Sequence, residues 1–406
     1  MKIMPLILLV IVFNLSVISL SVAQPASSLS QSDNHFAVDL YSRLDSTTGN
    51  VFFSPYSLSS ALSMTYDGAR GETAQEMQAV LHLNANDISR RDEISAFIQE
   101  INAPDKSYAL SVANAIWAQK AYPFKDDYLN LVKTVYFGQA RNLDFIADPE
   151  SSRQTINEWV ANQTNDRIHN LLPAGSIKSD TRLVLTDAVY FKGKWEIPFN
   201  KMLTKPDSFW LTPEQSVQVD MMEVQGKSFG YTENDEDQVL KLDYQGNDLS
   251  MVIILSRARD IQGLEKSLTE PILTQWQGRM VRQAVNVFLP KFKFDSNYQL
   301  KSVLSDMGMR LAFDQHDADF SGMAVLKPDE RLYIDQVYHK AWIDTDEQGT
   351  EAAAATGVGM FRATAMPMAF PPKEFRADHP FIFLIQDNKT GHVLFMGRVA
   401  DPRESN

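Results

Sequence analysis

The sequence predicts an α+β fold in one large domain, and three observations lead to this prediction. Helix-like and strand-like patterns are mixed along the chain without regular βαβ alternation. No long linker, internal repeat or low-complexity segment divides residues 33–402. Hydrophobic residues make up 44% of the 406 residues, which is enough for a substantial core. We therefore expect a single domain over residues 24–406, following a leader over residues 1–23.

The leader has the pattern of a secretory signal peptide. Lys2 supplies a positive charge, residues 5–20 are almost wholly apolar, and small residues at 21–23 precede the expected cut. No later stretch approaches the roughly 18 apolar residues that a membrane span needs. We therefore expect a secreted protein, or a periplasmic one if the source is a Gram-negative bacterium.

Three segments have the spacing of amphipathic helices. The first carries apolar residues at 36, 37, 40, 41 and 44, behind Ser32 and Asp33 as candidate N-caps. The second follows a capping box formed by Thr73 and Glu76. The third carries apolar residues at 156, 159, 160, 168 and 171 and is expected to end at Pro173.

Strand patterns are equally clear. Residues 183–191 are largely apolar and β-prone, and positions 337, 339, 341 and 343 alternate with more polar neighbours. Two apolar runs, 381–385 and 393–396, flank the turn sequence at 387–391. These two runs predict a buried hairpin close to the end of the chain.

The composition excludes several function classes. A net charge of −13 argues against a general binder of nucleic acids or anionic membranes. The chain has no cysteine, so disulfides, thiolate chemistry and Cys-ligated metals are absent. Hydrolase, metalloprotease and nucleotide-binding motifs are missing, and the seven histidines show no metal-ligand spacing. We therefore expect no metal, no cofactor and no enzymatic activity.

Six short segments resemble motifs of the serpin family, and they occur in the family's order. They are an N-x-x-F-S-P-x-S segment, a G-A-x-G-x-T segment, an N-A-x-Y-F-K-G-x-W strand, an L-P-K strand and a two-part terminal signature. In this chain they occupy residues 50–58, 68–73, 187–195, 289–291, 376–383 and 395–399. The resemblance implies the serpin fold, with three β-sheets, about nine helices and an exposed reactive loop at about residues 347–373.

The resemblance also implies a mechanism. A serpin offers its reactive loop as bait, and a serine protease cleaves the loop and becomes acylated. The freed hinge then inserts as a new strand into the largest sheet and distorts the protease before it can deacylate. Such an inhibitor is metastable and monomeric, and it ends in a covalent complex. The alternative is a non-inhibitory serpin that acts as a carrier or interaction protein.

The hinge is assigned to a run of small residues. If it inserts as a strand, alternate residues face the core. The set at 350, 352, 354 and 356 is small and uncharged, whereas the other set includes Glu351 and faces outward. An Ala-rich helix is the other interpretation, but Gly349 and the two threonines weaken it. The assigned hinge residues are Glu347, Gly349, Thr350, Glu351, Ala352, Ala353, Ala354, Ala355 and Thr356.

The resemblance also assigns the slot that receives the hinge. At its top, Lys291 and Glu347 are expected to pair near Trp195. The family usually has Asn where this chain has Asp187, so a buried carboxylate beside an imidazole either makes opening pH-sensitive or is a neutral change. The gate residues are Ser54, Ser57, Asp187 and His339.

The family's usual spacing places the cleaved bond sixteen residues after Glu347, between Ala363 and Thr364. That bond suits elastase-like proteases with small pockets. A shift of one residue gives the bond between Arg362 and Ala363, which suits trypsin-like proteases. We favour Ala363 because strand length during insertion sets the spacing. The downstream segment is longer than usual, which leaves two further candidates, Met366 and Met368.

Overall fold

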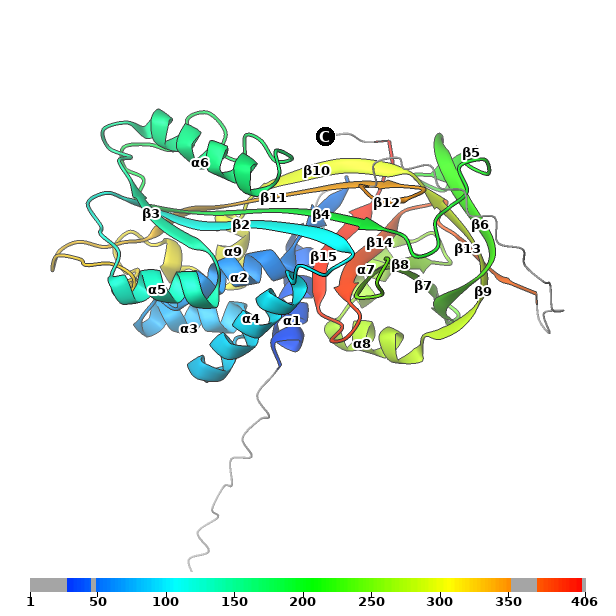
Figure 1. Ribbon diagram of the computed structural model, residues 1–406, viewed down its shortest axis with the longest axis horizontal. Helices are drawn as coiled ribbons and strands as arrows, with labels where there is room; N and C mark the ends of the chain where they lie inside the picture. Colours follow the sequence, from blue (N-terminus) through cyan, green and yellow to red (C-terminus); the bar gives the residue numbers. More distant parts are fainter. Residues whose placement is uncertain (1–27, 45–48, 352–370, 404–406) are drawn as a thin grey trace, which may run out of the picture.

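The computed structural model describes residues 28–44, 49–351 and 371–403, and it has the predicted α+β fold (Figure 1). The described residues contain nine α-helices and two hydrogen-bonded β-sheets. The leader at residues 1–23 lies outside the described residues.

The first sheet has six strands in the order β10-β11-β12-β4-β2-β3. Both of its faces are buried. Along β4, Leu185 and Val189 join the main core on one face, whereas Val184 and Ala188 join a smaller core on the other. This explains why residues 183–191 are almost continuously apolar. The strands are β10 (Phe292–Gln299), β11 (Ile334–Asp346), β12 (Gly349–Thr350), β4 (Leu183–Lys194), β2 (Tyr108–Gln119) and β3 (Gln139–Leu143).

The second sheet has nine strands, in the order β1-β15-β14-β8-β7-β6-β9-β13, with β5 paired to β6. The expected second and third sheets are joined here, because β6 and β9 pair along two stretches with only a bulge between Val224 and Lys227. The strands are β1 (Val51–Phe53), β5 (Lys205–Trp210), β6 (Ser216–Glu233), β7 (Asp237–Asp243), β8 (Leu249–Ser256), β9 (Val281–Pro290), β13 (Lys373–Arg376), β14 (Phe381–Asp387) and β15 (Val393–Val399).

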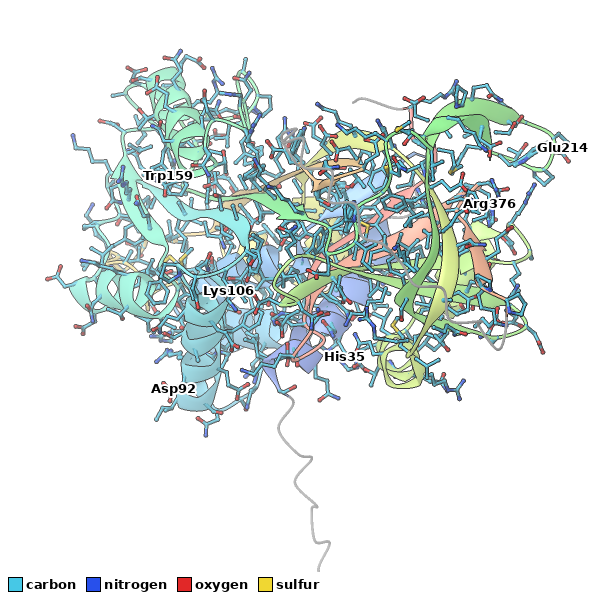
Figure 2. The ribbon with its side chains drawn as sticks, turned by 45° about the vertical axis from the view of Figure 1, so that its right-hand side comes forward. His35, Asp92, Lys106, Trp159, Glu214 and Arg376 are labelled. Carbon is cyan, nitrogen blue, oxygen red and sulfur yellow. The ribbon has the colours of Figure 1, made fainter. Side chains whose placement is uncertain are left out.

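Helices lie on both sides of the six-stranded sheet, and α7 and α8 lie beside the second sheet (Figure 1). Helix α6 covers one face, and α2 to α5 lie on the other side (Figure 1). Trp159 on α6 and Glu214 after β5 lie at opposite ends of the molecule (Figure 2). The helices are α1 (Leu29–Leu44), α2 (Pro55–Tyr66), α3 (Gly71–Val80), α4 (Asp87–Ile101), α5 (Asp126–Val135), α6 (Pro149–Gln163), α7 (Ile261–Ser267), α8 (Glu270–Arg279) and α9 (Lys301–Met307).

The predicted strands β4 and β11 and the hairpin of β14 and β15 are confirmed. The predicted caps of the first two helices were wrong. Helix α1 begins at Leu29, and Asp33 instead accepts a hydrogen bond from Ser59 Oγ at 2.5 Å. Helix α3 begins at Gly71, and Thr73 Oγ1 instead accepts from the backbone N–H of Asp319. In both cases a tertiary contact uses the polar side chain that the local pattern assigned to capping.

The third predicted helix was too long. Helix α6 ends at Gln163, where Asn165 and Asp166 adopt left-handed backbone angles with φ of 51° and 62°. Ile168 and Leu171 lie beyond the helix but are still buried in the smaller core. Their apolar spacing therefore reflects packing under the sheet and not a continued helix.

Candidate functional site

The centre of the site is a slot between β11 and β4. The two strands pair directly, in parallel, along residues 334–342 of β11 and 183–190 of β4. Beyond this stretch they are separated by the two-residue strand β12, which is antiparallel to both. Thr350 pairs with Thr345 on one side and with Gly193 on the other. The first residues of the assigned hinge thus already occupy the top of the slot.

Gly349 fits into the slot because it has no side chain. A Cβ atom at this position would lie 2.0 Å from the carbonyl oxygen of Gly193 and 2.7 Å from the Cα of Lys194. Its φ of +153° is also one that other residues rarely adopt. The opposing atoms belong to the backbone and cannot move aside as a side chain could, so glycine is required here.

Thr350 is buried on the face of the sheet that meets the main core. Its hydroxyl shares a hydrogen bond of 2.7 Å with the hydroxyl of Tyr244, whose pKa is raised by burial. The Tyr244 ring stacks on Trp195 with 4.7 Å between centroids. Trp195 in turn holds the preceding turn, because its backbone N–H donates to Gln348 O at 2.9 Å and its indole N–H donates to Asp346 O at 3.0 Å.

Glu347 and Lys291 form an ion pair at the top of the slot, beside Trp195. Lys291 Nζ lies 2.7 Å from Glu347 Oε1, and the Thr204 hydroxyl donates to the same oxygen at 2.8 Å. Burial opposes ionisation of Glu347. The Lys291 ammonium and the hydrogen bonds outweigh it and hold the pKa of Glu347 below its ordinary value. The carboxylate therefore stays charged although its side chain is only 3% exposed.

Glu351 ends the inserted strand. Its backbone has a left-handed φ of +47°, and its N–H donates to Asp344 O at 2.6 Å. Its side chain lies on the opposite face from Thr350 and pairs with Arg167 at 2.5 Å. The carboxylate also raises the pKa of Tyr190, after burial as the larger cause. A non-glycine residue with positive φ is strained, so the strand ends at a residue with an unfavourable backbone conformation.

The gate lies where β11 and β4 are still paired. Asp187 and His339 are direct neighbours across the two strands, and both are fully buried. His339 Nδ1 contacts Asp187 Oδ1, and the Ser57 hydroxyl donates to Asp187 Oδ2 at 2.5 Å. The Ser54 hydroxyl donates a hydrogen bond to Leu394 O on β15 at 2.6 Å. The structure thus brings the four predicted gate residues together and connects them to the second sheet.

The hydrogen bonds define which ring nitrogen of His339 carries the proton. The backbone N–H of Ser54 donates to His339 Nε2 at 3.1 Å, so Nε2 must be an unprotonated acceptor. The proton therefore sits on Nδ1 and is donated to Asp187. Neither serine hydroxyl meets the imidazole, so this buried group is not arranged as the nucleophile and base of a hydrolase.

A model of the family "Serpin (serine protease inhibitor)" matches residues 31–402. The chain belongs to the serpin family. An uncharacterized serpin-like protein of Thermococcus kodakarensis is 42% identical, with 91% of this chain and 85% of that protein covered. The leukocyte elastase inhibitor of Xenopus tropicalis is 39% identical over 92% of this chain and 100% of that protein.

Solved structures agree with this family. The crystal structure of Serpin48, a highly specific serpin of the insect Tenebrio molitor, has a TM-score of 0.80 and 32% identity. It covers 92% of this chain and 98% of that one. The chain therefore has the serpin fold and belongs to a family whose general activity is protease inhibition by the serpin mechanism.

Several predicted residues lie outside the part of this serpin that the structure describes. They are Ala352, Ala353, Ala354, Ala355 and Thr356 of the hinge, and Arg362, Ala363, Thr364, Met366 and Met368 of the reactive loop. Within the described ranges, no group of three or more metal-binding side chains is present, and no helix is long and apolar enough to cross a membrane.

Sequence reasoning missed three residues that contact the hinge. Tyr244 and Thr204 lie in no motif, and each contributes a single hydroxyl to a site built by distant segments. Arg167 is an exposed-looking residue in a polar stretch after α6, and only the fold shows its pairing with Glu351. No sequence pattern could have identified these partners, because each pairing joins residues that are more than a hundred positions apart.

Replacing Gly349 by alanine should expel β12 from the slot. The added Cβ overlaps backbone atoms, and overpacking of this kind costs about 1–3 kcal/mol. Residues 345–351 should lose hydrogen-exchange protection, and the melting temperature should fall. Gly278→Ala is the matched control, because nothing lies within 4 Å of a Cβ there. Unchanged protection in Gly349→Ala would contradict the inserted position of β12.

Replacing Lys291 by methionine should make the stability cost depend on pH. In the wild type, the lowered pKa of Glu347 means that its stabilising effect is complete above the ordinary value of 4.5 and is lost as the pH falls through the folded-state value. The variant leaves the carboxylate without its cation. The stability difference between the two proteins should therefore grow from pH 3.5 to pH 6.5 and reach about 1–2 kcal/mol.

Urea unfolding at a series of pH values measures this difference. Lys293→Met is the control, because Lys293 pairs with Asp344 at a more exposed position of the same region. Its effect on stability should be small and nearly flat with pH. A Lys291→Met variant that follows the same flat course would mean that the ion pair with Glu347 contributes nothing to the hinge.

Proposed function

We propose that this serpin is a secreted inhibitor of serine proteases that acts as a suicide substrate. The observation that carries the proposal is the position of β12, whose two residues lie between β11 and β4 and pair with both. A hinge that has already started as a strand needs only to continue along the same slot once the loop is cut. Residues 1–23 supply the export signal in this proposal.

The change in hydrogen bonding makes insertion of the hinge energetically favourable. Below Thr350, residues 334–342 of β11 pair directly with β4 in parallel. A new strand between them replaces one parallel ladder by two antiparallel ladders, and the antiparallel pairing is slightly more stable per residue. Backbone groups that water solvates in the loop become paired inside the sheet. Insertion therefore lowers the free energy, and the intact protein is held by a kinetic barrier.

Two contacts and one strained backbone angle contribute to that barrier. The pairing of Glu351 with Arg167 must break, and the backbone of Glu351 must change from a φ of +47° to an extended conformation. The buried contact between Asp187 and His339 must separate, because the new strand passes between them. Each contact slows insertion before cleavage. They must be weak enough for insertion to outrun deacylation of the trapped protease.

The target that we propose is an elastase-like serine protease, with cleavage between Ala363 and Thr364. The spacing of sixteen residues from Glu347 supports this bond. The similarity to a leukocyte elastase inhibitor supports the protease class. Cleavage between Arg362 and Ala363 by a trypsin-like protease is the second candidate, followed by cleavage at Met366 or Met368. The partner forms a covalent complex with a monomeric inhibitor, and neither nucleic acid nor membrane takes part.

A non-inhibitory serpin, acting as a carrier or interaction protein, is the alternative function. In that case the loop would be cleaved without trapping, as expected for a hinge that cannot insert. The placement of Gly349 and Thr350 inside the slot favours the inhibitor. In neither case does the protein turn over a substrate as an enzyme.

Thr350→Arg should convert the inhibitor into a substrate. Thr350 already lies in the slot, in a site closed by Tyr244, so arginine should keep β12 out of the slot; burying its unpaired charge during insertion would then cost several kcal/mol. An increase of about 1.4 kcal/mol in the barrier already slows insertion tenfold, so hydrolysis then wins. The number of inhibitor molecules cleaved per protease molecule trapped should rise at least tenfold. Titration against pancreatic elastase with detection of the SDS-stable complex measures it.

Ala353→Arg is the matched control, because this position belongs to the outward-facing set of an inserted hinge. It should trap protease at nearly the wild-type ratio. If Thr350→Arg traps as well as Ala353→Arg does, the insertion mechanism is wrong. Wild-type protein cut in the loop should also melt at a clearly higher temperature than intact protein, whereas ordinary nicking would leave stability unchanged or lower it.

The two neighbouring candidates for the bait make opposite forecasts. If Ala363 enters the protease pocket, Ala363→Arg should redirect inhibition to trypsin, and Arg362→Ala should leave elastase inhibition intact. If Arg362 is the bait, Arg362→Ala should abolish trypsin inhibition, because losing a buried charged contact costs about 2–5 kcal/mol. Elastase association rates and mass spectrometry of the cut decide between them. If Ala363→Asp inhibits elastase as well as the wild type does, the assignment of Ala363 as the residue that enters the protease pocket is wrong.

A further inference from the structure

The C-terminal end of the assigned reactive loop is held by a short connection that the proposed mechanism does not use. Residues 377–380 join β13, where the loop returns to the second sheet, to β14. In the described sheet β13 has four residues and pairs with β9 alone. A strand this short needs further contacts to stay in place. The connection supplies two through its backbone, because Ala377 N–H donates to Phe288 O at 2.9 Å and Asp378 O accepts from Trp210 N–H at 2.8 Å.

His379 adds side-chain contacts that a neutral histidine cannot make. The ring is buried, with 5% of the residue exposed. Its Nδ1 lies 2.7 Å from Asp378 Oδ1, and its Nε2 lies 2.7 Å from Ser256 O at the end of β8. Both oxygens are acceptors, whereas a neutral imidazole carries a single N–H. Two donating nitrogens make this ring an imidazolium, and such distances are typical of charge-assisted hydrogen bonds.

The neighbouring charges keep the proton on the ring. Arg259 Nη2 lies 3.2 Å from Asp378 Oδ2, so this carboxylate has a second cation and stays ionised. On β7, Asp237 is the partner of Ser256 in the strand ladder and adds a further carboxyl group nearby. Arg257, which follows Ser256, pairs with a glutamate at the end of β6. The charged group that contacts the ring is thus the carboxylate of Asp378.

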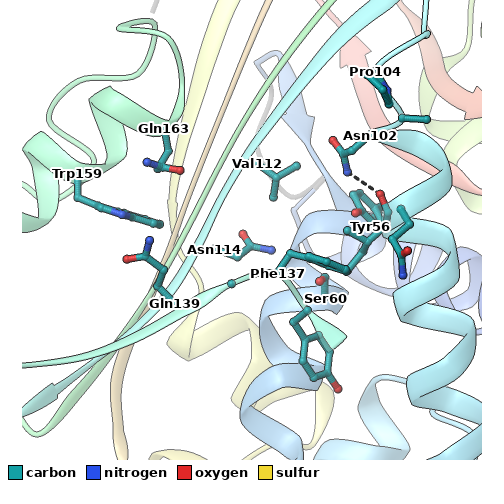
Figure 3. Close-up of a pocket in the computed structure, with 15 residues that line it drawn as sticks. Tyr56, Ser60, Asn102, Pro104, Val112, Asn114, Phe137, Gln139, Trp159 and Gln163 are labelled. Carbon is teal, nitrogen blue, oxygen red and sulfur yellow. Dashed lines mark hydrogen bonds between the residues drawn. The ribbon is translucent and has the colours of Figure 1, made fainter. Parts of the chain in front are cut away.

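His339 at the gate shows the opposite arrangement. Its Nδ1 contacts Asp187, but its Nε2 accepts from the backbone N–H of Ser54, so that ring is neutral. Ser57 at the gate also bonds with the uncharged carboxamide of Asn114 on β2, whose side chain faces α2 (Figure 3). Two buried histidines that both contact a carboxylate therefore differ in charge, because the partner of the second nitrogen differs.

We propose that His379 is a positively charged clamp that holds the C-terminal end of the reactive loop and is released in alkaline solution. An ordinary histidine loses its proton near about pH 6.5. The folded ring keeps a proton that the unfolded chain would give up, so its contribution to stability is complete below about pH 6.5. The contribution is lost as the pH rises far enough to remove the proton from the folded ring. Either Asp378 or Ser256 then faces a nitrogen without a hydrogen.

The clamp positions the bait, and this step rests on the proposed function. The loop is attached to the body at β12 on one side and at β13 on the other. A loop with one loosened end spends less time in the shape that a protease binds, so the protease should associate more slowly. Insertion after cleavage uses the hinge, which is attached at β12. The ratio of cleaved to trapped inhibitor should therefore not change.

The charge can be measured in the intact wild-type protein, by NMR of ¹⁵N-labelled histidine at pH 7.5. Both ring nitrogens of His379 should carry a proton, whereas His339 should carry one on Nδ1 alone. The His379 signals are assigned through dipolar contacts with Ser256 and Pro380, so this measurement needs no variant. A His379 ring with one unprotonated nitrogen at this pH overturns the proposal.

The attachment of β13 is measured by hydrogen exchange, expressed as protection factors so that the pH dependence of exchange itself cancels. From pH 7.0 to pH 9.5, protection at residues 374–378 should fall about tenfold in the wild type, as expected for one charged hydrogen bond. His379→Lys stays mostly charged over this range and should keep its protection. His379→Gln should already have the lower protection at pH 7.0. His316→Gln, on an exposed turn, is the control and should follow the wild type. A wild-type profile that is flat with pH overturns the clamp.

The effect on inhibition is tested separately against pancreatic elastase. The association rate of the wild type is divided by that of His379→Lys at the same pH, which removes the pH dependence of the protease. This quotient should fall about threefold from pH 7.0 to pH 9.5, while the ratio of cleaved to trapped inhibitor stays constant. A constant quotient overturns the positioning role of His379. If no complex forms at any pH, the proposed function fails while the NMR and exchange results stand.

Discussion

Much of the structure depends on how β11 and β4 share their hydrogen bonds. Over residues 334–342 they bond to each other, and above that point both bond to β12. The sheet therefore has room for a central strand of which only two residues, β12, are in place. Ordinary sheets avoid such an arrangement, because backbone N–H and C=O groups in a core need hydrogen-bond partners. Where β12 is absent, β11 and β4 satisfy these backbone groups by pairing directly with each other, in parallel. The cores on the two faces, the gate and the residues around the hinge all keep that pairing in place without making it permanent.

The same constraint explains why the site mixes very small and strongly interacting residues. Gly349 fits because the surrounding backbone atoms leave no room for a side chain, and Thr350 fits because its hydroxyl can hydrogen-bond with Tyr244. Glu351, by contrast, stops the strand with an ion pair and a strained backbone. The gate below combines an imidazole with a carboxylate, Asp187, in a fully buried position. A charge there requires every partner to be present, so small displacements of β4 have a large energetic effect.

Patterns in the sequence predicted the parts of this molecule that are local. The alternation in β11, the apolar run of β4 and the terminal hairpin each follow from burial, and the structure contains all three. The caps predicted at Asp33 and Thr73 were wrong because long-range contacts use the same polar atoms. The pairing of Lys291 with Glu347 was predicted from the family resemblance. No sequence pattern indicated that Arg167 pairs with Glu351. A contact between distant segments leaves no periodic trace in either of them.

The place of the terminal hairpin has a consequence for how the protein is made. Strand β15 lies between the edge strand β1 and strand β14 of the second sheet, and its Leu394 carbonyl accepts a hydrogen bond from the Ser54 hydroxyl. Synthesis delivers this strand last, long after β1, the gate serines and the hinge. The nine-stranded sheet is therefore incomplete until β15 has been synthesised. Until then, β1 and β14 each have an unpaired edge, and unpaired edges of this kind can mispair.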